Sequence, residues 1–442
     1  METRLDCETA TSSSEEGTFF SEDQLRDMIS KSQGKIRGKP DMPPDPIAIA
    51  VWSAVSKLNP NNGGVHSKNW KARHAGSRKS PWETFRQCEA ELINFVAEYY
   101  AADTAQIDGY VTSGASEGNL MGLWLARNSI IAKQGTGKRI AVISCENAHF
   151  SIRKACDILA FENGEQSTSA PRNKHITIRA DNEFRLSIAE LRNAVLSLID
   201  EGISAIIIVA TLGTTVAGAI DDLPAISLLS REIENLHRVS IVIHVDAALG
   251  GVLFPFLPDS PFPAKWREWS HVQSLTLDLH KFGITPYGCG AFLCLGDTLK
   301  SVERSAGYTT SGLDATILGS RSGAMAAAAF AVLQSKGLNG LRHDVGRARE
   351  LVADLRSRLC SNTAVSLLPD GGLNVVPIAI DDQTKEGSRI ADFLEGCGIF
   401  SDILSTSNRP SASLRVFPLY VMPDVTEKSV AEFTNDLSQA CL

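Results

Sequence analysis

The sequence predicts an α/β domain with a mainly parallel sheet, followed by a smaller α+β domain. From about Ile107, short strands alternate with helices, and this alternation is typical of α/β proteins. Several strands, such as AIIIVA and IVIHV, are almost continuously apolar, as strands covered on both faces are. After about Gly312 the pattern changes to Ala-rich and amphipathic helices with two further strands. We therefore expect an N-terminal segment at 1–80, a large domain at 81–311 and a small domain at 312–442.

The expected elements follow the chain in order. Strands are expected at 110–112, 140–144, 176–179, 205–210, 241–246, 274–278, 291–295, 373–380 and 413–416. Helices are expected at 22–34, 47–58, 82–100, 118–132, 186–199, 223–236, 324–333 and 341–359, with a last one around 430–437. Ser187 and Glu190 have the spacing of a capping box, and Pro224 falls in a first helical turn, where proline is tolerated. The stretch 59–81 is polar and basic, and is either a solvated loop or a lid that touches an anionic group.

Composition and charge argue against several classes of protein. The chain has 442 residues, of which 43% are hydrophobic and 21% charged, as is ordinary for globular proteins. The net charge of −8 disfavours nucleic acid as the main partner. No apolar run approaches the ~20 residues that a membrane span needs, and the acidic N-terminus lacks the features of a targeting signal. The nine cysteines have no metal-ligand spacing, so neither a metal site nor a disulfide scaffold is indicated, and the cytoplasm fits best.

Lys281 is the residue around which the candidate site is organised. It follows an apolar strand candidate, SLTLD, and precedes an aromatic residue and a Gly/Pro-rich turn. A lysine amine at the end of a buried strand can be desolvated, which lowers its pKa and makes it a nucleophile for carbonyl groups. A Schiff-base lysine needs these properties, whereas a solvated lysine at a strand end is the alternative for Lys281 considered alone.

Four further loops place small or polar residues at the C-terminal ends of predicted strands, where open α/β sheets bind ligands. In the first, Gly114, Ala115 and the hydroxyl of Ser116 precede a helix whose free N–H groups favour a phosphate. A tight turn with an N-cap serine explains the same residues. In the second, His149 follows a strand and either lies flat on a planar cofactor or packs in the core.

The other two loops contain an acid and two threonines. Asp246 ends an apolar strand, and a buried carboxylate there needs a partner, which is a protonated ring nitrogen, a metal ion or an arginine. Ala248 is small enough for a flat ring to pack against. Thr214 and Thr215 follow another strand and can reach a phosphate or a ring hydroxyl. A phosphate cradle, a stacking histidine, an acid for a ring nitrogen and a lysine for an aldehyde together describe pyridoxal 5′-phosphate (PLP).

The motifs SGASEGN, HVDAALGG, DLHKFG and LGSRSGA resemble those of the group II PLP-dependent amino-acid decarboxylases. The archaeal tyrosine/aspartate and bacterial histidine decarboxylase types are the most similar. The resemblance runs from about Trp82 to the C-terminus. It implies fold type I, the aspartate-aminotransferase type, and a homodimer with its sites at the interface, to which residues 1–80 contribute contacts. It also implies PLP as cofactor and, as substrate, a small molecule of the amino-acid class.

The resemblance assigns roles to individual residues. Lys281 would be the Schiff-base lysine, and Asp246 would pair with the ring nitrogen. His149 would stack on the ring, and Ala248 would pack beneath it. The remaining cofactor contacts, to the phosphate or the ring hydroxyl, would come from Ala115, Ser116, Thr214, His280 and, across the dimer, Thr316.

Two more residues have weaker matches. Tyr308 corresponds to a loop tyrosine that protonates the substrate carbon after carbon dioxide leaves, and its alternative role is to anchor the loop. Arg415 either binds the substrate carboxylate or forms a structural ion pair.

The expected reaction is decarboxylation of an L-amino acid to its amine through an external aldimine and a quinonoid intermediate. One alternative is a carbon–carbon lyase, because DLHKFGITPYGCG also resembles sphingosine-phosphate-lyase-type enzymes. An aldehyde-forming decarboxylase is a second, and a non-catalytic homologue, which Lys281, Asp246 and His149 disfavour, is a third. The sequence does not identify the substrate side chain.

Overall fold

The structure is a computed structural model. It describes residues 23–24, 27–28, 33–63, 66–67, 81–100, 104–163, 173–257, 269–282, 284–307, 312–381, 383–404 and 414–441. Residues 1–33 and 34–442 form separate compact units, and the sheets and the candidate site belong to the second unit. Most of the helix expected at 22–34, and the basic residues of the stretch 59–81, lie outside the described residues.

An eight-stranded sheet is the centre of the second unit, with the strand order β1-β8-β7-β6-β5-β2-β4-β3. Its strands are β1 (Ile107–Thr112), β2 (Ile140–Cys145), β3 (Glu162–Asn163), β4 (Asn173–Ile178), β5 (Ala205–Thr211), β6 (Ser240–Asp246), β7 (Val272–Asp278) and β8 (Gly290–Leu295). The strands from β7 to β3 are parallel, and β8 is antiparallel to both of its neighbours. Since β8 reverses direction between them, β1 and β7 run the same way. The C-terminal ends of β1, β2, β5, β6 and β7 therefore lie at one edge of the sheet.

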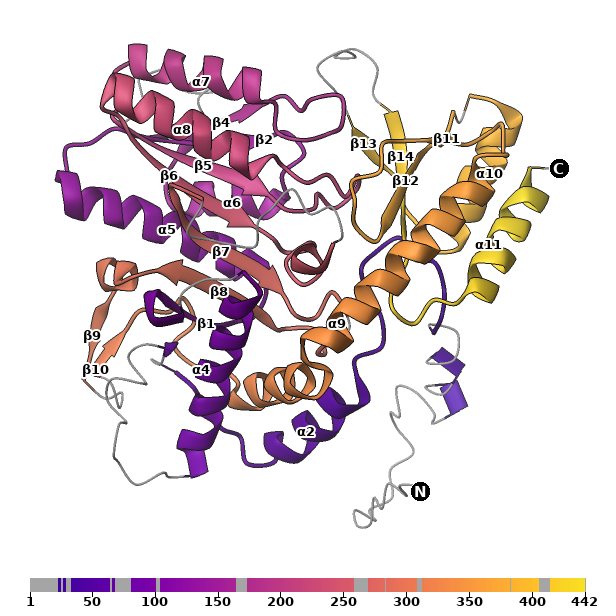
Figure 1. Cartoon of the computed structure of the whole chain (residues 1–442), viewed down its shortest axis with the longest axis horizontal. Coiled ribbons are helices and arrows are strands. Elements are labelled where there is room, and N and C mark those ends of the chain that lie inside the picture. Colours follow the sequence, from indigo (N-terminus) through magenta and orange to yellow (C-terminus); the bar gives the residue numbers. More distant parts are fainter. Residues whose placement is uncertain are drawn as a thin grey trace, which may run out of the picture. The chain divides into compact units, whose positions relative to one another are not determined.

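Helices cover both faces of this sheet (Figure 1). They are α5 (Ala115–Gln134), α6 (Phe150–Ile158), α7 (Ile188–Asp200) and α8 (Leu223–His237). On β5, Ile207 packs with residues of α5 and α6, whereas the adjacent Ile206 and Ile208 belong to the apolar cluster on the α7 and α8 side. Because successive side chains of a strand point to opposite faces, a strand buried on both faces has a continuous apolar run. The predicted α/β class is confirmed.

A four-stranded antiparallel sheet follows in the last third of the chain, with the order β11-β12-β14-β13. Its elements are β11 (Ser366–Leu367), β12 (Val375–Ala379), β13 (Asp402–Leu404) and β14 (Leu414–Tyr420), accompanied by α10 (Lys385–Gly396) and α11 (Glu427–Ala440). These strands and helices form the α+β arrangement that the sequence predicts after residue 312. The domain boundaries at 81 and 312 stay a prediction.

Helix α9 (Gly323–Leu359) connects the region of β1 to the small sheet (Figure 1). The sequence predicts two separate helices here, and α9 consists of two helical segments joined at Gly337, whose φ of 57° and ψ of −176° are not helical. Glycine adopts such a conformation without the Cβ clash of other residues, so the chain changes direction between the two predicted helices. Helices α2 (Pro46–Ser56) and α4 (Pro81–Tyr99) both pack on α9.

Several short elements were not predicted. They are α6, α10, β3, β11 and β13, the hairpin of β9 (Arg304–Ala306) and β10 (Gly312–Asp314), and the single turns η1 (Thr104–Gln106), η2 (Phe254–Phe256) and η4 (Thr298–Ser301). The missed strands and single turns have two to four residues, too few side chains for a periodic pattern to appear, whereas α6 and α10 are long enough and were simply overlooked. The predicted N-cap of α7 is present, since Ser187 accepts a hydrogen bond from the N–H of Glu190. Over the described ranges, no helix has the length and apolarity to cross a membrane.

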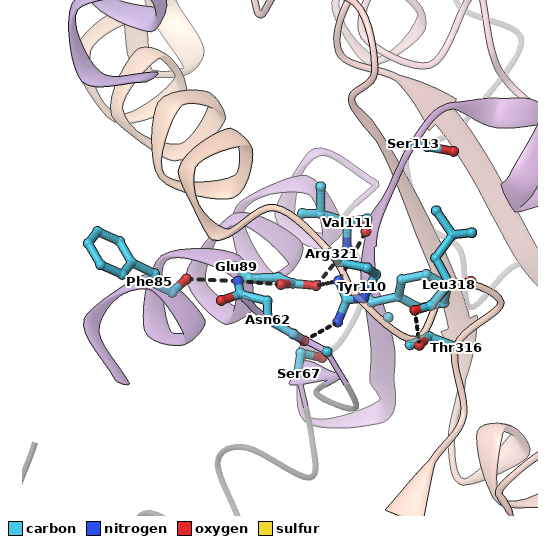
Figure 2. Close-up of polar contacts among 12 residues, drawn as sticks. Asn62, Ser67, Phe85, Glu89, Tyr110, Val111, Ser113, Thr316, Leu318 and Arg321 are labelled. Carbon is cyan, nitrogen blue, oxygen red and sulfur yellow. Dashed lines mark hydrogen bonds and ion pairs between the residues drawn. The ribbon is translucent and has the colours of Figure 1, made fainter. Parts of the chain in front are cut away.

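A buried ion pair closes the outer edge of β1 (Figure 2). Glu89 of α4 accepts a hydrogen bond of 2.9 Å from the N–H of Val111, and Arg321 donates one of 3.0 Å to the Val111 carbonyl. The two side chains also pair with each other, and Arg321 donates to the carbonyl of Asn62 at 2.9 Å. An edge strand leaves such backbone groups unpaired, and here two side chains satisfy them. The pair thereby ties the end of β1 to α4 and to the start of α9.

Candidate active site

Lys281 lies just beyond the end of β7, next to a buried carboxylate. Its Nζ is 3.1 Å from Oδ2 of Asp278, and the two side chains are 20% and 4% exposed. The other oxygen, Oδ1 of Asp278, accepts a hydrogen bond of 2.6 Å from the N–H of Ala115, the first residue of α5. His280 donates from Nδ1 to the carbonyl of Cys289 at 2.8 Å. Asp278 therefore joins the end of β7 to the start of α5, and three predicted residues lie around it.

The start of α5 forms a shallow cradle. Its N-cap is Gly114, which makes no side-chain capping bond, and its φ of 147° is one that L side chains rarely adopt. A Cβ at this position would lie 3.3 Å from Cε1 of His280. Ser116 is exposed in the first turn. Gly114 makes no side-chain cap, but the N–H of Ala115 already donates to Asp278, so an anion such as a phosphate would rely on the N–H and hydroxyl of Ser116 in this turn.

Asp246 ends β6, and His149 lies in the loop after β2, two strands away in the sheet. Asp246 is the last residue of β6, is 2% exposed and accepts a hydrogen bond of 3.0 Å from the N–H of Ala248. His149 is the N-cap of α6. Burial lowers the pKa of His149, and the charge of Lys281 lowers it further, while Asp246 opposes both effects. Since the charges of Lys281 and Asp246 both act on the ring of His149, the three predicted residues share one electrostatic environment.

Thr214 and His149 both line a cavity of about 510 Å³. The ends of β2 and β5 and residues Asp402–Leu404 of β13 form the rest of the wall. The hydroxyl of Thr214 accepts a hydrogen bond of 3.1 Å from the N–H of Ala219. Within the part of the chain that the structure describes, neither Lys281 nor Asp246 lines this cavity. The cavity therefore adjoins the predicted cofactor site without containing its lysine.

Thr316 lies beside the ion pair at the edge of β1 (Figure 2). It is 6% exposed, and its hydroxyl is 2.8 Å from Oδ1 of Asp314 and 2.9 Å from the carbonyl oxygen of Leu318. These contacts are local to its own loop. They do not bring Thr316 to Lys281 of the same chain, and its role across a dimer stays a prediction.

Arg415 lies on β14 of the small sheet. It forms an ion pair with Glu395 and donates a hydrogen bond of 2.9 Å from Nε to Ser401. The structure therefore has the ion pair that was one of the two alternatives for this residue, and binding of the substrate carboxylate stays a prediction. Tyr308 lies outside the described residues.

Residues 85–377 match the family model of the pyridoxal-dependent decarboxylase conserved domain. The chain belongs to this family. This chain is 30% identical over 355 residues to a probable L-aspartate decarboxylase of Archaeoglobus fulgidus. The match covers 79% of this chain and 83% of that protein. The chain is 32% identical over 333 residues to a probable L-tyrosine/L-aspartate decarboxylase of Methanocella arvoryzae, covering 75% of this chain and 78% of that protein.

Solved structures show the same fold at lower identity. An L-methionine decarboxylase from Streptomyces sp. 590 matches with a TM-score of 0.77 and 18% identity, over 94% of this chain and 93% of that one. A sphingosine-1-phosphate lyase from Burkholderia pseudomallei matches with a TM-score of 0.72 and 19% identity, over 98% and 93%. Both likenesses concern the fold, which is fold type I as predicted. The family match favours the decarboxylase over the lyase alternative, and it confirms PLP as the cofactor.

The site residues of this decarboxylase fit PLP. Asp246 supplies a buried carboxylate for a ring nitrogen, and the first turn of α5 supplies the exposed Ser116 for a phosphate. Lys281 supplies a largely buried primary amine. PLP, when bound, withdraws electrons from the substrate carbon, and the protein provides orientation and fixed charges.

Two residues next to the site, Asp278 and Asn119, were not predicted as functional. Asp278 contacts both Lys281 and Ala115, and Asn119 donates a hydrogen bond of 2.9 Å to Oδ2 of Asp246. The only sequence signal for Asp278 is a carboxylate at the end of an apolar strand, the same signal that identified Asp246. Asn119 and Asp246 are 127 residues apart in sequence, and no local pattern joins them.

Acid pH is expected to destabilise the decarboxylase through two buried histidines. Burial lowers the pKa of His175 and of His244 to about 4, while an unfolded histidine has a pKa of about 6.5. The unfolded chain therefore takes up these protons first, and the stability present above pH ~6.5 is lost as the pH falls toward 4. The loss is at most about 3 kcal/mol per histidine.

Urea unfolding at several pH values between 7.5 and 4.5 measures this loss. His175→Gln keeps a partner for Ser144, which lies 2.9 Å from the His175 ring, but removes one titrating group. The difference between wild type and His175→Gln isolates that histidine from the titrating carboxylates. Equal slopes of stability against pH for the two proteins would contradict the prediction.

Proposed function

We propose that this decarboxylase releases the α-carboxyl group of an L-amino acid as carbon dioxide and yields the corresponding amine. The observation that carries the proposal is the Lys281 amine held against buried Asp278, with Asp246 linked through Asn119 and Ser151 to His149. Lys281 would be the residue that holds the aldehyde of PLP, and Asp246 would be the partner of its ring nitrogen. His149 and Ala248 cover the two faces of the ring.

The remaining roles follow the start of α5 and the loops near it. Ala115, the hydroxyl of Ser116 and the ring of His280 would hold the phosphate, with Thr214 near the phosphate or ring hydroxyl. Thr316 reaches the phosphate from a second copy of the chain. Tyr308 returns a proton to the substrate carbon, and Arg415 is the candidate for the substrate carboxylate.

The product distinguishes this reaction from its alternatives. L-Aspartate, L-tyrosine and L-glutamate come first in the substrate panel, because relatives of the chain are named for them. With PLP-loaded protein, we expect carbon dioxide and amine in equal amounts from at least one amino acid. The assay measures both products, together with aldehyde and ammonia. Aldehyde and ammonia in place of amine would indicate the aldehyde-forming reaction and overturn the proposal.

A homodimer is part of the proposal, and helix α2 supports it. The helix packs on α9, yet Ile47, Ile49 and Trp52 remain 37%, 41% and 39% exposed, and Ala48 is its only buried residue in the described structure. An exposed apolar helix of this kind is typical of a surface that another protein covers. A second copy of the chain is the proposed occupant, as in the family that the sequence resembles.

Charge on α2 is expected to shift the protein toward monomers. In Ile49→Glu/Trp52→Glu, two carboxylates replace apolar side chains, and burying them between subunits would be costly. Light scattering coupled to gel filtration measures the mass against that of wild type. Leu236→Glu is the matched control, because Leu236 of α8 is 69% exposed and isolated from α2. If the doubly substituted protein is as dimeric as this control, helix α2 no longer supports the proposed homodimer.

The proposal places the enzyme in the cytoplasm, without nucleic acid or membrane as partners. The cysteines that the structure describes are all free thiols, as is usual in a reducing compartment. The net charge of −8 is the support for excluding nucleic acid.

A further inference from the structure

Asn119 lies at the centre of a buried hydrogen-bond network between two of the proposed cofactor residues. Its side-chain amide donates 2.9 Å bonds both to Oδ2 of Asp246 and to Oγ of Ser151. Its amide oxygen is 3.0 Å from Nε2 of His244, and Oγ of Ser151 is 2.8 Å from Nδ1 of His149. Asn119 is 1% exposed. One amide group therefore touches the ring-nitrogen acid directly and the stacking histidine through a single serine.

The geometry of the network determines where its protons lie. Nδ1 of His149 accepts a hydrogen bond from the N–H of Ser151, so this ring nitrogen carries no proton. The Ser151 hydroxyl must then donate to Nδ1, and its oxygen is left to accept from Asn119. The neutral His149 ring, which burial favours by lowering its pKa, therefore has its single proton on Nε2.

The orientation of the Asn119 amide follows from the same assignment of hydrogen-bond donors and acceptors. A flipped amide would set its oxygen against the carboxylate of Asp246, with no proton between them. In the present orientation the amide oxygen accepts from Nε2 of His244. The other ring nitrogen of His244, Nδ1, is 2.8 Å from Oγ of Ser274, which donates to it. Burial lowers the pKa of His244 to about 4, so this ring is neutral and the amide is held in one orientation.

Two glycines of α5 allow this close approach. A Cβ at Gly122 would lie 2.2 Å from Nδ1 of His244, and one at Gly118 would lie 1.9 Å from Oγ1 of Thr276. Both distances are far below any van der Waals contact. The glycines therefore let α5 pack directly on β6 and β7, which brings Asn119 to Asp246.

We propose that Asn119 is a positioning residue for the cofactor site. Its amide holds the Asp246 carboxylate in one orientation, and through Ser151 it sets the tautomer and the ring orientation of His149. The inference rests on the proposed roles of Asp246 and His149. The competing explanation is that Asn119 only packs α5 against the sheet, in which case its loss lowers stability alone.

Asn119→Asp separates these two explanations, because it keeps the size of the side chain and replaces the donor by a carboxylate next to Asp246. Two carboxylates so close share a proton, which weakens the hold of Asp246 on a ring nitrogen. We expect the affinity for PLP, measured by fluorescence titration of the full-length protein, to fall about 10- to 100-fold, as with other supporting residues of a site. The visible absorbance of the loaded protein should change as well.

Ser151→Ala isolates the branch that leads to His149. In protein labelled with ¹⁵N-histidine, we expect wild-type His149 to have its proton on Nε2, and Ser151→Ala and Asn119→Asp to show an increased fraction on Nδ1. His149→Gln assigns the signal. Asn374→Ala is the matched control, since Asn374 is also fully buried but bonds the carbonyl of Val421 in the small sheet. It should lose stability while keeping the PLP affinity and the His149 tautomer.

The outcomes distinguish this inference from the proposed function. If Asp246→Asn binds PLP as wild type does, the proposed role of Asp246 is wrong, and the inference fails with it. If Asp246→Asn loses PLP while Asn119→Asp behaves like Asn374→Ala, only the inference is overturned. Where Asn119→Asp does not fold, Ser151→Ala decides: an unchanged His149 tautomer in that variant is evidence against the network.

Discussion

Lys281→Ala is expected to lower turnover by a thousandfold or more, on the order found when a covalent catalytic residue is removed. The variant has no amine at the end of β7 to attach to the cofactor aldehyde, and it also removes the cation 3.1 Å from buried Asp278. Carbon dioxide release measures turnover. Reduction with borohydride followed by mass spectrometry measures attachment, and we expect one PLP adduct per chain in wild type and none in the variant.

Lys281→Arg separates the chemistry of the residue from its charge. An arginine keeps a cation near Asp278, but it cannot serve as the Schiff-base amine, so stability should be retained while turnover and attachment are lost. Lys300→Ala is the control for lysine loss in general, because Lys300 is 67% exposed and pairs only with Asp297 in the described structure. Turnover near the wild-type level in Lys281→Ala would show that the central assignment is wrong.

Arg321→Met is expected to destabilise the protein by about 3–5 kcal/mol, a large part of the ~5–15 kcal/mol by which proteins are stable. The substitution leaves the buried carboxylate of Glu89 without its cation and the Val111 carbonyl without its side-chain donor (Figure 2). Urea unfolding measures the free energy. Arg192→Met is the matched control, because the pair of Arg192 and Glu232 is 43% and 45% exposed and solvent screens it, so its loss should barely change the stability.

The double variant Glu89→Gln/Arg321→Met tests the reason for this loss. A neutral amide in place of the carboxylate no longer needs the cation, so the double variant should be more stable than Arg321→Met alone. Equal stability of the two would mean that the loss arises from packing and not from the unpaired charge. Since β1 leads directly to Gly114 and Ala115, we also expect Arg321→Met to bind PLP more weakly than the Arg192→Met control.

The sequence predicted the central sheet and the strand ends that meet at the site. Asp246, His149 and Lys281 each follow an apolar run, and a polar residue in that position is conspicuous in any single stretch of sequence. The same local reasoning predicted the two helical segments that meet at the non-helical Gly337. It missed β13, whose three residues line the cavity beside His149. Short elements are stabilised by their neighbours in space, which a local pattern does not record.

The supporting residues of the site could not be predicted from the sequence, for the same reason. Asn119 was visible as part of SGASEGN, but nothing near it in sequence indicates a contact with Asp246 and, through Ser151, with His149. Arg321 and Glu89 are 232 residues apart, and only the folded chain shows that together they hold Val111.

The sequence by itself determined the α/β class and the cofactor and singled out Lys281 as the candidate lysine, because apolar periodicity and the residue types at strand ends are properties of short stretches. Tertiary structure decided which partners surround that lysine. Asp278 contacts both Lys281 and the start of α5, Asn119 orients the Asp246 carboxylate, and the apolar face of α2 remains exposed. Hydrogen bonds and burial depend on distances between residues far apart in the chain, and those distances exist only once the sheet has ordered its strands.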